Sequence, residues 1–309
     1  MKSKKHKKLI KNKTNKRLKK FRRNKVYKTF FNYKGGMIDK LIGEGTHGKI
    51  YTLKSNHRQV VKIYTNRSLI KKQKSLCLKI KKSYDSTCDE LNYEYIIQNI
   101  IGTAFREHLL NIFVPTVTDF NILNNNCFYV MDRIFPLKDK ILFLDMTKDY
   151  KLETVNIGKQ IGYNNACELF SITPPELSYL LGQMFSLLHF HLKLDGYDCE
   201  LIIGRENELS DNPKLYFIDF DKVSCFEFNS SQTLYRKISE EYVEDKIINS
   251  PKKLAYFLFG SLISMSLLPI DPELKNNFLE GYKTYLNHDI EEQNIVMDEM
   301  VKLIQEYEI

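Results

Sequence analysis

Three glycines and one lysine near the start of the chain have the types and spacing expected of a site for phosphate groups. Gly43, Gly45 and Gly48 fit the pattern G-x-G-x-x-G, in which the missing Cβ atoms let the backbone approach a ligand closely. Lys62 follows inside the apolar run of residues 59–64, where its amine is a positive point charge. The sequence therefore predicts that this region holds an anionic ligand.

The elements around these residues distinguish between two folds that share this glycine spacing. In dinucleotide-binding folds the glycines open a helix, and an acidic residue follows about 20 positions later. Here residues 49–54 and 59–64 have the composition of strands, and residues 55–57 form a predicted turn between them. A glycine loop between strands, followed by a strand that carries a lysine, resembles the ATP-binding hairpin of the protein-kinase-like superfamily.

This resemblance implies ATP and Mg²⁺ as cofactors, with the three glycines and Lys62 against the phosphates. Lys62 then needs a carboxylate from the next helix, which apolar spacing predicts over residues 89–101. Glu90 and Glu94 lie four apart on one face of that helix. Glu94 is the preferred partner, because it sits among apolar residues where a carboxylate needs a cation.

A second pair of strands is predicted at residues 115–123 and 127–131, joined by an Asn-rich turn. In the protein-kinase-like superfamily the second of these strands leads into the connection between the two lobes. The resemblance implies that residues 130–134, from Val130 to Ile134, lie along the edge of the adenine, with Val130, Met131 and Asp132 as the binding residues.

A helix signal in the second half of the chain begins at Thr173. Thr173 is a predicted N-cap, prolines occupy the first turn, and Glu176 stands three residues after the cap. Apolar residues then recur at helical spacing as far as Leu188. A comparable helix precedes the catalytic loop in protein kinases. His189 and His191, near its end, are interpreted as packing residues.

Three acidic residues follow this helix in the order of the catalytic and metal-binding residues of protein kinases. The resemblance implies that Asp195 positions the acceptor hydroxyl and that Glu200 and Asp219 bind Mg²⁺. Asp198 is the alternative to Asp195, because residues 197–204 resemble part of an uncharacterised, kinase-like fungal domain family.

The chain departs from the kinase pattern at several of these positions. Lys193 replaces the His of His-Arg-Asp, Glu200 replaces an Asn, Asp221 replaces the Gly of Asp-Phe-Gly, and no Ala-Pro-Glu follows. Glu can ligate Mg²⁺ through its carboxylate. Small-molecule phosphotransferases also lack Ala-Pro-Glu, so the acceptor class stays open. The departures leave a catalytically inactive pseudokinase as the alternative interpretation.

Further helices are predicted from residue 251, over residues 272–286 and over residues 291–307, with prolines at the first two starts. Residues 138–172 mix charged and apolar residues without a clear period. They are expected to form a connecting helix or an insertion.

The charge distribution divides the chain into a basic arm and an acidic body. Residues 1–36 contain 16 Lys or Arg and no Asp or Glu, which leaves 47 − 16 = 31 basic and 38 acidic residues, a net charge of −7, in the remainder. The arm is expected to be disordered. Residues 1–34 are expected to meet nucleic acid or another anionic surface, and the alternatives are a nuclear localisation signal, a contact with the acidic body of the same chain, and a solvated tail without a partner. The longest apolar stretch, residues 254–268, is broken by polar residues and is shorter than the roughly 20 residues that span a bilayer, so no transmembrane segment is expected.

The six cysteines are scattered without a C-x-x-C pair. This spacing argues against a disulfide framework and a zinc site, and it predicts reduced thiols in an intracellular protein of the cytoplasm or nucleus. The Lys-, Asn- and Ile-rich composition is similar to that of proteins from AT-rich genomes, including large DNA viruses, for which a virion location is a further expectation.

Together these features predict an α+β protein with a two-lobed, protein-kinase-like fold. The expected domains are a basic arm at 1–35, a small lobe with an antiparallel sheet at 36–134, and a mainly helical lobe at 135–309. The expected function is Mg-ATP-dependent phosphoryl transfer to a protein Ser/Thr or a small molecule. The alternative is a pseudokinase scaffold or an interaction protein with a nucleic-acid-binding arm.

Overall fold

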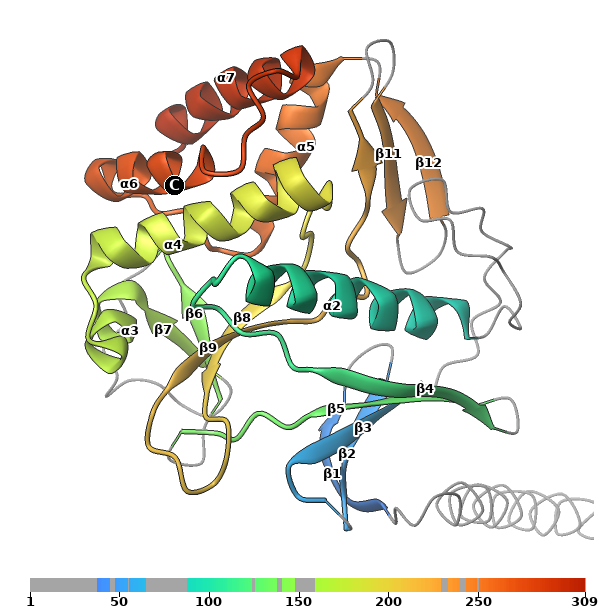
Figure 1. Cartoon of the computed structure of the whole chain (residues 1–309). Helices are drawn as coiled ribbons and strands as arrows, with labels where there is room; N and C mark the ends of the chain where they lie inside the picture. Colours follow the sequence, from blue (N-terminus) through green and yellow to red (C-terminus); the bar gives the residue numbers. More distant parts are fainter. Residues whose placement is uncertain are drawn as a thin grey trace, which may run out of the picture.

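The computed structural model of the chain describes residues 38–44, 48–54, 56–64, 88–123, 126–137, 141–147, 159–228, 233–238, 243–248 and 250–308. These residues form an α+β structure, in which an antiparallel sheet and helix α2 lie beside a part that contains the other helices described (Figure 1). The predicted basic arm, residues 1–35, and Gly45 of the glycine loop lie outside the described residues.

The N-terminal sheet has five antiparallel strands in the order β1-β2-β3-β5-β4. They are β1 (Ile38–Glu44), β2 (Gly48–Leu53), β3 (Gln59–Tyr64), β4 (Val117–Leu123) and β5 (Asn126–Asp132). The strands expected from the sequence in this region are therefore confirmed to within two residues. The register places Lys62 of β3 opposite Tyr129 of β5.

Helix α2 (Asp89–Glu107) lies against β4 and β5 and confirms the helix expected from residue 89. Its apolar side buries Ile97, Ile101 and Phe105 in the main core. Glu94 is buried on the same helix, so its carboxylate faces the protein interior rather than water. A buried carboxylate needs a charged or hydrogen-bonding partner.

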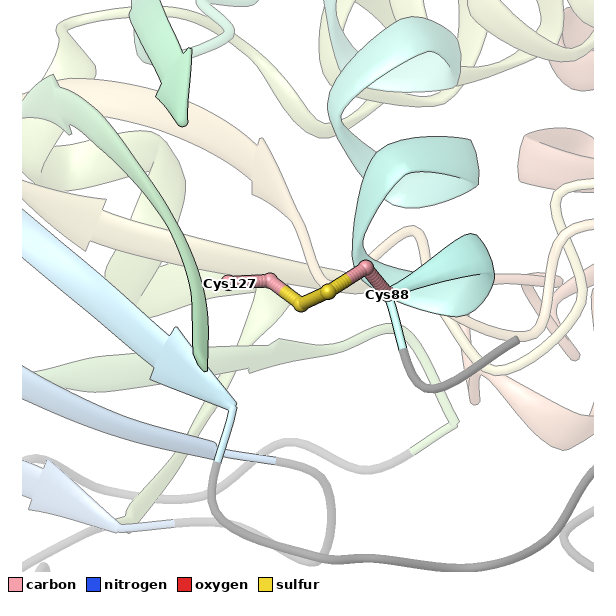
Figure 2. Close-up of a disulfide and its surroundings, with 2 residues drawn as sticks. All are labelled: Cys88 and Cys127. Atoms are coloured by element: carbon pink, nitrogen blue, oxygen red, sulfur yellow. A yellow bond between two sulfur atoms is a disulfide. The ribbon is translucent and has the colours of Figure 1, made fainter. Parts of the chain in front are cut away.

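A disulfide between Cys88 and Cys127 joins the start of α2 to β5 (Figure 2). The expectation that all cysteines are reduced thiols is therefore wrong for this pair. The two residues are 39 positions apart in the sequence, but the packing of α2 on the sheet brings their Cα atoms to 5.6 Å, which is a normal spacing for a disulfide. Among the described residues, Cys167, Cys199 and Cys225 form no disulfide, and all three are buried.

A second sheet connects the first to the helices. It contains β6 (Leu142–Asp145), β7 (Lys159–Gly162), β8 (Glu200–Gly204) and β9 (Lys214–Ile218) in the order β7-β6-β8-β9. Strands β6 and β7 are parallel, and β8 and β9 form an antiparallel hairpin. The described part of residues 138–172 therefore contains strands and the short helix α3 (Tyr163–Phe170), where the sequence suggested a connecting helix or an insertion.

The remaining helices pack as a group over the second sheet (Figure 1). They are α4 (Pro174–Ser186), which continues into the π-helical turn η2 (Leu187–Leu192), then α5 (Pro251–Ser264), α6 (Pro272–Tyr282) and α7 (Glu291–Glu306). The capping box of Thr173 and Glu176 is present, which confirms the predicted start of α4. His189 of η2 is buried, with Nδ1 2.5 Å from the hydroxyl of Tyr282, in agreement with a packing role.

A third sheet, formed by β10 (Phe226–Glu227), β11 (Thr233–Ile238) and β12 (Val243–Ile248), extends beside α5 (Figure 1). In the part of the chain that the structure describes, no helix is both long enough and apolar enough to cross a bilayer.

Candidate functional site

A pocket of about 480 Å³ lies between the five-stranded sheet and the β8–β9 hairpin. Its volume is in the range of pockets that bind small molecules. Apolar side chains from both sides form its walls, including Ile42, Val60, Ile202 and Ile218. Its charged lining residues are Glu44, Lys62, Glu94, Asp132, Arg133, Asp198, Glu200, Asp219, Asp221 and Lys222.

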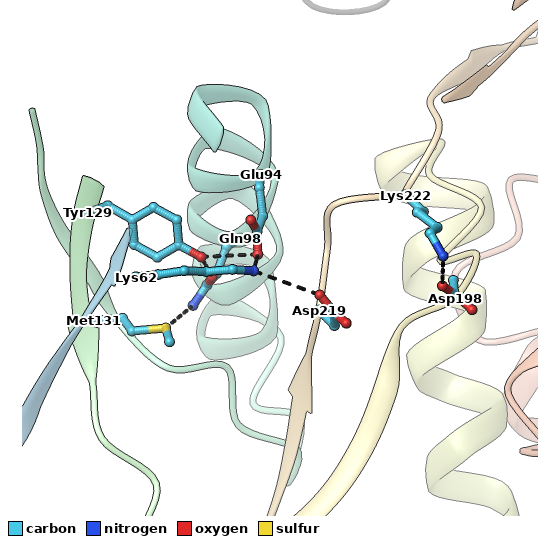
Figure 3. A network of polar contacts seen from close by, with 8 residues as sticks. All are labelled: Lys62, Glu94, Gln98, Tyr129, Met131, Asp198, Asp219 and Lys222. Carbon is cyan, nitrogen blue, oxygen red and sulfur yellow. Dashed lines mark hydrogen bonds and ion pairs between the residues drawn. The ribbon is translucent and has the colours of Figure 1, made fainter. Parts of the chain in front are cut away.

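Lys62 meets two carboxylates inside this pocket (Figure 3). Its Nζ lies 2.5 Å from Oε1 of Glu94 and 3.8 Å from Oδ1 of Asp219. Burial alone lowers the pKa of Lys62, but the charges of Glu94 and Asp219 outweigh this effect and raise the pKa, so the amine stays charged. The structure thus brings together a strand lysine, a helix glutamate and a loop aspartate that the sequence had linked only through a family pattern.

Two uncharged residues complete the environment of Glu94 (Figure 3). The hydroxyl of Tyr129 donates to Oε1 of Glu94 over 3.1 Å, and burial and the charge of Glu94 raise the pKa of Tyr129. Gln98, one turn further along α2, lies 3.3 Å from the same hydroxyl, and its Nε2 donates to the carbonyl of Pro115 over 2.8 Å. Sequence reasoning missed both residues. The available signals were the cross-strand position of Tyr129 and the four-residue spacing from Glu94 to Gln98.

The opposite side of the pocket carries a group of acidic residues around the β8–β9 hairpin. Asp198 pairs with Lys222, with Oδ2 and Nζ 2.5 Å apart (Figure 3). Loss of hydration, with the charges of Asp219 and Asp198, raises the pKa of Glu200 to about 7. Burial and the charge of Asp219 likewise raise the pKa of Asp221 to about 7.

The pKa of Asp219 depends on both burial and neighbouring charge. Burial raises its pKa, and the nearby charge of Lys62 opposes that shift. Its backbone has a φ of 66°, in the left-handed region that non-glycine residues rarely adopt. Such outliers persist where the surrounding structure imposes them, and they occur often at functional sites.

Asp195 lies outside the pocket lining, in contrast to Asp198. It is fully buried, and its Oδ1 accepts hydrogen bonds from the backbone N–H groups of Tyr197 (3.0 Å) and Ser224 (2.7 Å). These contacts hold the loop before β8 against the segment after β9. The catalytic role expected for Asp195 therefore lacks geometric support, whereas the alternative, Asp198, faces the pocket.

The structure describes only part of the predicted glycine loop, and only some of the residues expected at the adenine edge line the pocket. Gly43 lines the pocket, and Gly48 begins β2 opposite Tyr64. A Cβ on Gly43 would lie 3.7 Å from the side chain of Ile50, an ordinary contact, so packing does not require glycine there.

On the other side of the pocket mouth, Met131 and Asp132 line the cavity, whereas Val130 is absent from its lining and pairs within the sheet with Val61. The N–H of Asp132 is used by the carbonyl of Thr116. Ile134, two residues further along, also lines the pocket. Within the described residues, its N–H and C=O make no backbone hydrogen bond. Within the expected stretch from Val130 to Ile134, the backbone groups left for a ligand are thus at the Ile134 end.

Among the described residues, no three His, Cys, Asp or Glu side chains are close enough to hold a metal ion by themselves. Mg²⁺ in phosphate-binding sites commonly uses one or two carboxylates together with water and phosphate oxygens. Glu200 and Asp219, whose charges interact, fit that smaller donor set.

No protein-family model matches this chain, and no curated protein is similar to it at a significant level.

Proposed function

We propose that the chain is a Mg-ATP-dependent phosphotransferase with a divergent, two-lobed kinase-like arrangement. The observation that carries the proposal is the position of Lys62, which lines the pocket and lies within ion-pair distance of both Glu94 and Asp219. A lysine fixed by one carboxylate and adjacent to a second suits a ligand that brings both phosphate groups and a cation.

In this proposal Lys62 binds the α- and β-phosphates, and Glu94 fixes the direction of its amine. Tyr129 holds Glu94 through its hydroxyl, so the lysine is oriented before the nucleotide arrives. Gly43 leaves the backbone open to the phosphates. Glu200 and Asp219 would hold Mg²⁺, which neutralises phosphate charge when bound.

We assign the acceptor-positioning role to Asp198, in place of Asp195, because Asp198 lines the pocket and Asp195 is buried against backbone amides. The amine of Lys222, 2.5 Å from Asp198, supplies a second positive charge on that side. Phosphoryl transfer needs little covalent chemistry from the protein, so these two groups act by position and charge.

The nucleotide base would lie between the apolar walls of the pocket, with the backbone of Ile134 as its hydrogen-bonding edge. Val60 on the sheet side and Ile202 and Ile218 on the other side supply flat apolar contact. Because ATP is an intracellular substrate, we place the chain inside the cell. The acceptor, protein or small molecule, stays open.

Transfer of the labelled γ-phosphate from ATP tests the proposal. We expect wild-type protein to turn over Mg-ATP, and Asp219→Ala and Asp198→Asn to reduce the rate by roughly two to three orders of magnitude. Undiminished turnover in Asp219→Ala would mean that the site assignment is wrong. A larger loss in Asp195→Asn than in Asp198→Asn, with the fold intact, would reverse the choice between the two acids.

The second candidate is a pseudokinase scaffold. The observation in its favour is the Asp198–Lys222 ion pair, because Lys222 engages the carboxylate that a transfer reaction would need to position the acceptor. Mg-ATP binding without any turnover, across protein and small-molecule acceptors, is the result that would favour it.

A further inference from the structure

The Cys88–Cys127 disulfide joins the two elements whose side chains orient Lys62. Cys88 stands immediately before α2, which carries Glu94 and Gln98. Cys127 is two residues before Tyr129 on β5, so both side chains point to the same face of the strand, toward α2. The hydrogen bond from Tyr129 to Glu94 therefore spans the same interface as the covalent bond (Figures 2 and 3).

In the described part of the chain, the start of α2 contacts the sheet through a small apolar cluster as well as through the disulfide. Its N-cap residue is Cys88, which supplies no side-chain hydrogen bond to the free N–H groups of the first turn. Five buried residues form the small apolar cluster there: Cys88, Leu91, Val117, Cys127 and Tyr129. The large core that holds the rest of the molecule is a separate cluster, reached by α2 only from Tyr93 onward. The disulfide is thus the covalent link between the first turns of α2 and the sheet, beside this apolar cluster.

We propose that the Cys88–Cys127 disulfide is a redox-sensitive positioning element for the nucleotide site. In the oxidised state it holds α2 against β5, so Glu94 and Tyr129 meet beside Lys62. In the reduced state the first turns of α2 separate from β5 and Glu94 loses its fixed place. This inference rests on the proposed function for its effect on Mg-ATP, but its effect on α2 is independent of any ligand.

The chemistry is thiol–disulfide exchange with a dithiol reductant. A thiolate of the reductant attacks Sγ of Cys127, the bond between the two cysteine sulfurs breaks, and Cys88 leaves as a thiolate. The N-terminus of α2 stabilises that thiolate, which makes Cys88 the better leaving group. The second thiol of the reductant then displaces Cys127, leaving two protein thiols and one oxidised reductant after protons are taken from water. Both cysteines are buried, so exchange requires α2 to open at its start.

The loss of this link is expected to be local. The main core contains α4 to α7 and the β8–β9 hairpin, none of which depends on Cys88 or Cys127. The reduced protein should therefore stay folded while its affinity for Mg-ATP falls by about tenfold, the usual range for coupling between two sites.

The experiment compares the oxidised full chain, the same protein reduced with dithiothreitol, and the Cys88→Ala/Cys127→Ala variant, all in a Cys77→Ala background. Cys167→Ala is the matched control, because it removes a buried free thiol and keeps the disulfide. Amide hydrogen exchange of residues 89–94, Mg-ATP affinity by calorimetry and the thermal transition are measured for each.

We expect faster exchange at residues 89–94 and weaker Mg-ATP binding in the reduced protein and in the double variant, with a thermal transition retained. Cys167→Ala should respond to dithiothreitol as its parent does. Equal exchange in the oxidised and reduced states overturns the inference, and so does loss of the whole thermal transition on reduction. Absence of Mg-ATP binding in the oxidised protein contradicts the proposed function instead, and hydrogen exchange then decides the positioning role alone.

Discussion

At the scale of single residues, the buried pair of Lys62 and Glu94 dominates the site. The two side chains are 12% and 4% exposed, so each charge depends on the other for compensation. A lysine without Glu94 would lose its direction, and Glu94 without a cation would be an isolated buried charge, which is among the most costly defects in a folded protein.

Lys62→Met is expected to lower the free energy of unfolding by about 3–5 kcal/mol, because it leaves Glu94 buried and uncompensated. Lys62→Met combined with Glu94→Gln should recover most of that loss, since both charges are then removed. Neither variant should bind Mg-ATP. Urea unfolding and calorimetry measure the two effects separately, and a Lys62→Met protein as stable as wild type would contradict the ion-pair account.

The acidic residues of the pocket predict a dependence on pH. Glu200 and Asp221 have pKa values of about 7 in the folded protein, against ordinary values of 4.5 and 3.8. Between those values the folded chain holds protons that the unfolded chain has released. The free energy of unfolding therefore falls as the pH rises from about 4 to 7 and levels off above 7. Mg²⁺ competes with these protons, so it should stabilise the protein more at pH 8 than at pH 6.

Thermal unfolding from pH 5 to 8, with and without MgCl₂, checks this dependence. The variant Glu200→Gln/Asp221→Asn should lose less stability as the pH rises and should gain less from Mg²⁺. A variant whose pH profile and Mg²⁺ response match those of wild type would show that these two carboxyls do not titrate as described.

At the scale of elements, two glycines set the distance between α4 and α6. A Cβ on Gly182 would lie 2.0 Å from the carbonyl oxygen of Phe278, and one on Gly281 would lie 2.1 Å from that of Tyr179. The backbones of the two helices are therefore in direct contact at both points. The same contact brings the hydroxyl of Tyr282 to Nδ1 of His189 in the main core.

Gly182→Ala should lower the free energy of unfolding by more than about 3 kcal/mol, because the helices must separate to admit the methyl group. Gly260→Ala is the control, since a Cβ there meets nothing within 4 Å. That control, on helix α5, should be neutral or stabilise the protein by up to about 1 kcal/mol. Denaturant unfolding that gives equal results for the two variants would contradict the observed helix crossing.

The elements that sequence could predict are those with local signals. Thr173 and Glu176 form a capping box, prolines mark the starts of α5 and α6, and a β-branched run marks β3. Strand β6 is only four residues long and pairs in parallel with β7 and antiparallel with β8, so its partners come from distant parts of the chain. The sequence of residues 138–172 shows no clear helix or strand period, because short strands that pair with distant parts of the chain leave little alternation of apolar and polar residues.

The site was predictable where a motif fixes both residue type and order, as for Lys62, Glu94 and Asp219. The site was not predictable where the contacts of a residue depend on how separate elements pack in three dimensions. The burial of Asp195, the approach of Tyr129 to Glu94 and the meeting of Cys88 with Cys127 all depend on how elements pack, which spacing in the sequence does not determine by itself.

At the scale of the whole molecule, charge is divided between the arm and the rest. The 16 basic residues of positions 1–36 contrast with the net charge of −7 elsewhere. An anionic body repels nucleic acid, so any affinity for it must come from the arm.

Full-length protein should bind duplex DNA or RNA with an affinity that falls by about 10³-fold or more between 50 and 200 mM salt, as expected for many phosphate contacts. Removal of residues 1–36 should abolish this binding and leave Mg-ATP affinity unchanged. Fluorescence anisotropy across a salt series measures the first effect. Equal nucleic-acid binding by the truncated protein would contradict a role for the arm.

The most direct test of the central claim is calorimetric titration of the oxidised full chain with ATP, with and without MgCl₂, for wild type and Asp219→Asn. If Lys62, Glu94 and Asp219 form one site for a nucleotide and its cation, wild type binds ATP about tenfold or more tightly with Mg²⁺, and Asp219→Asn loses that gain. The same affinity in all four titrations, or no binding in any, would contradict the account.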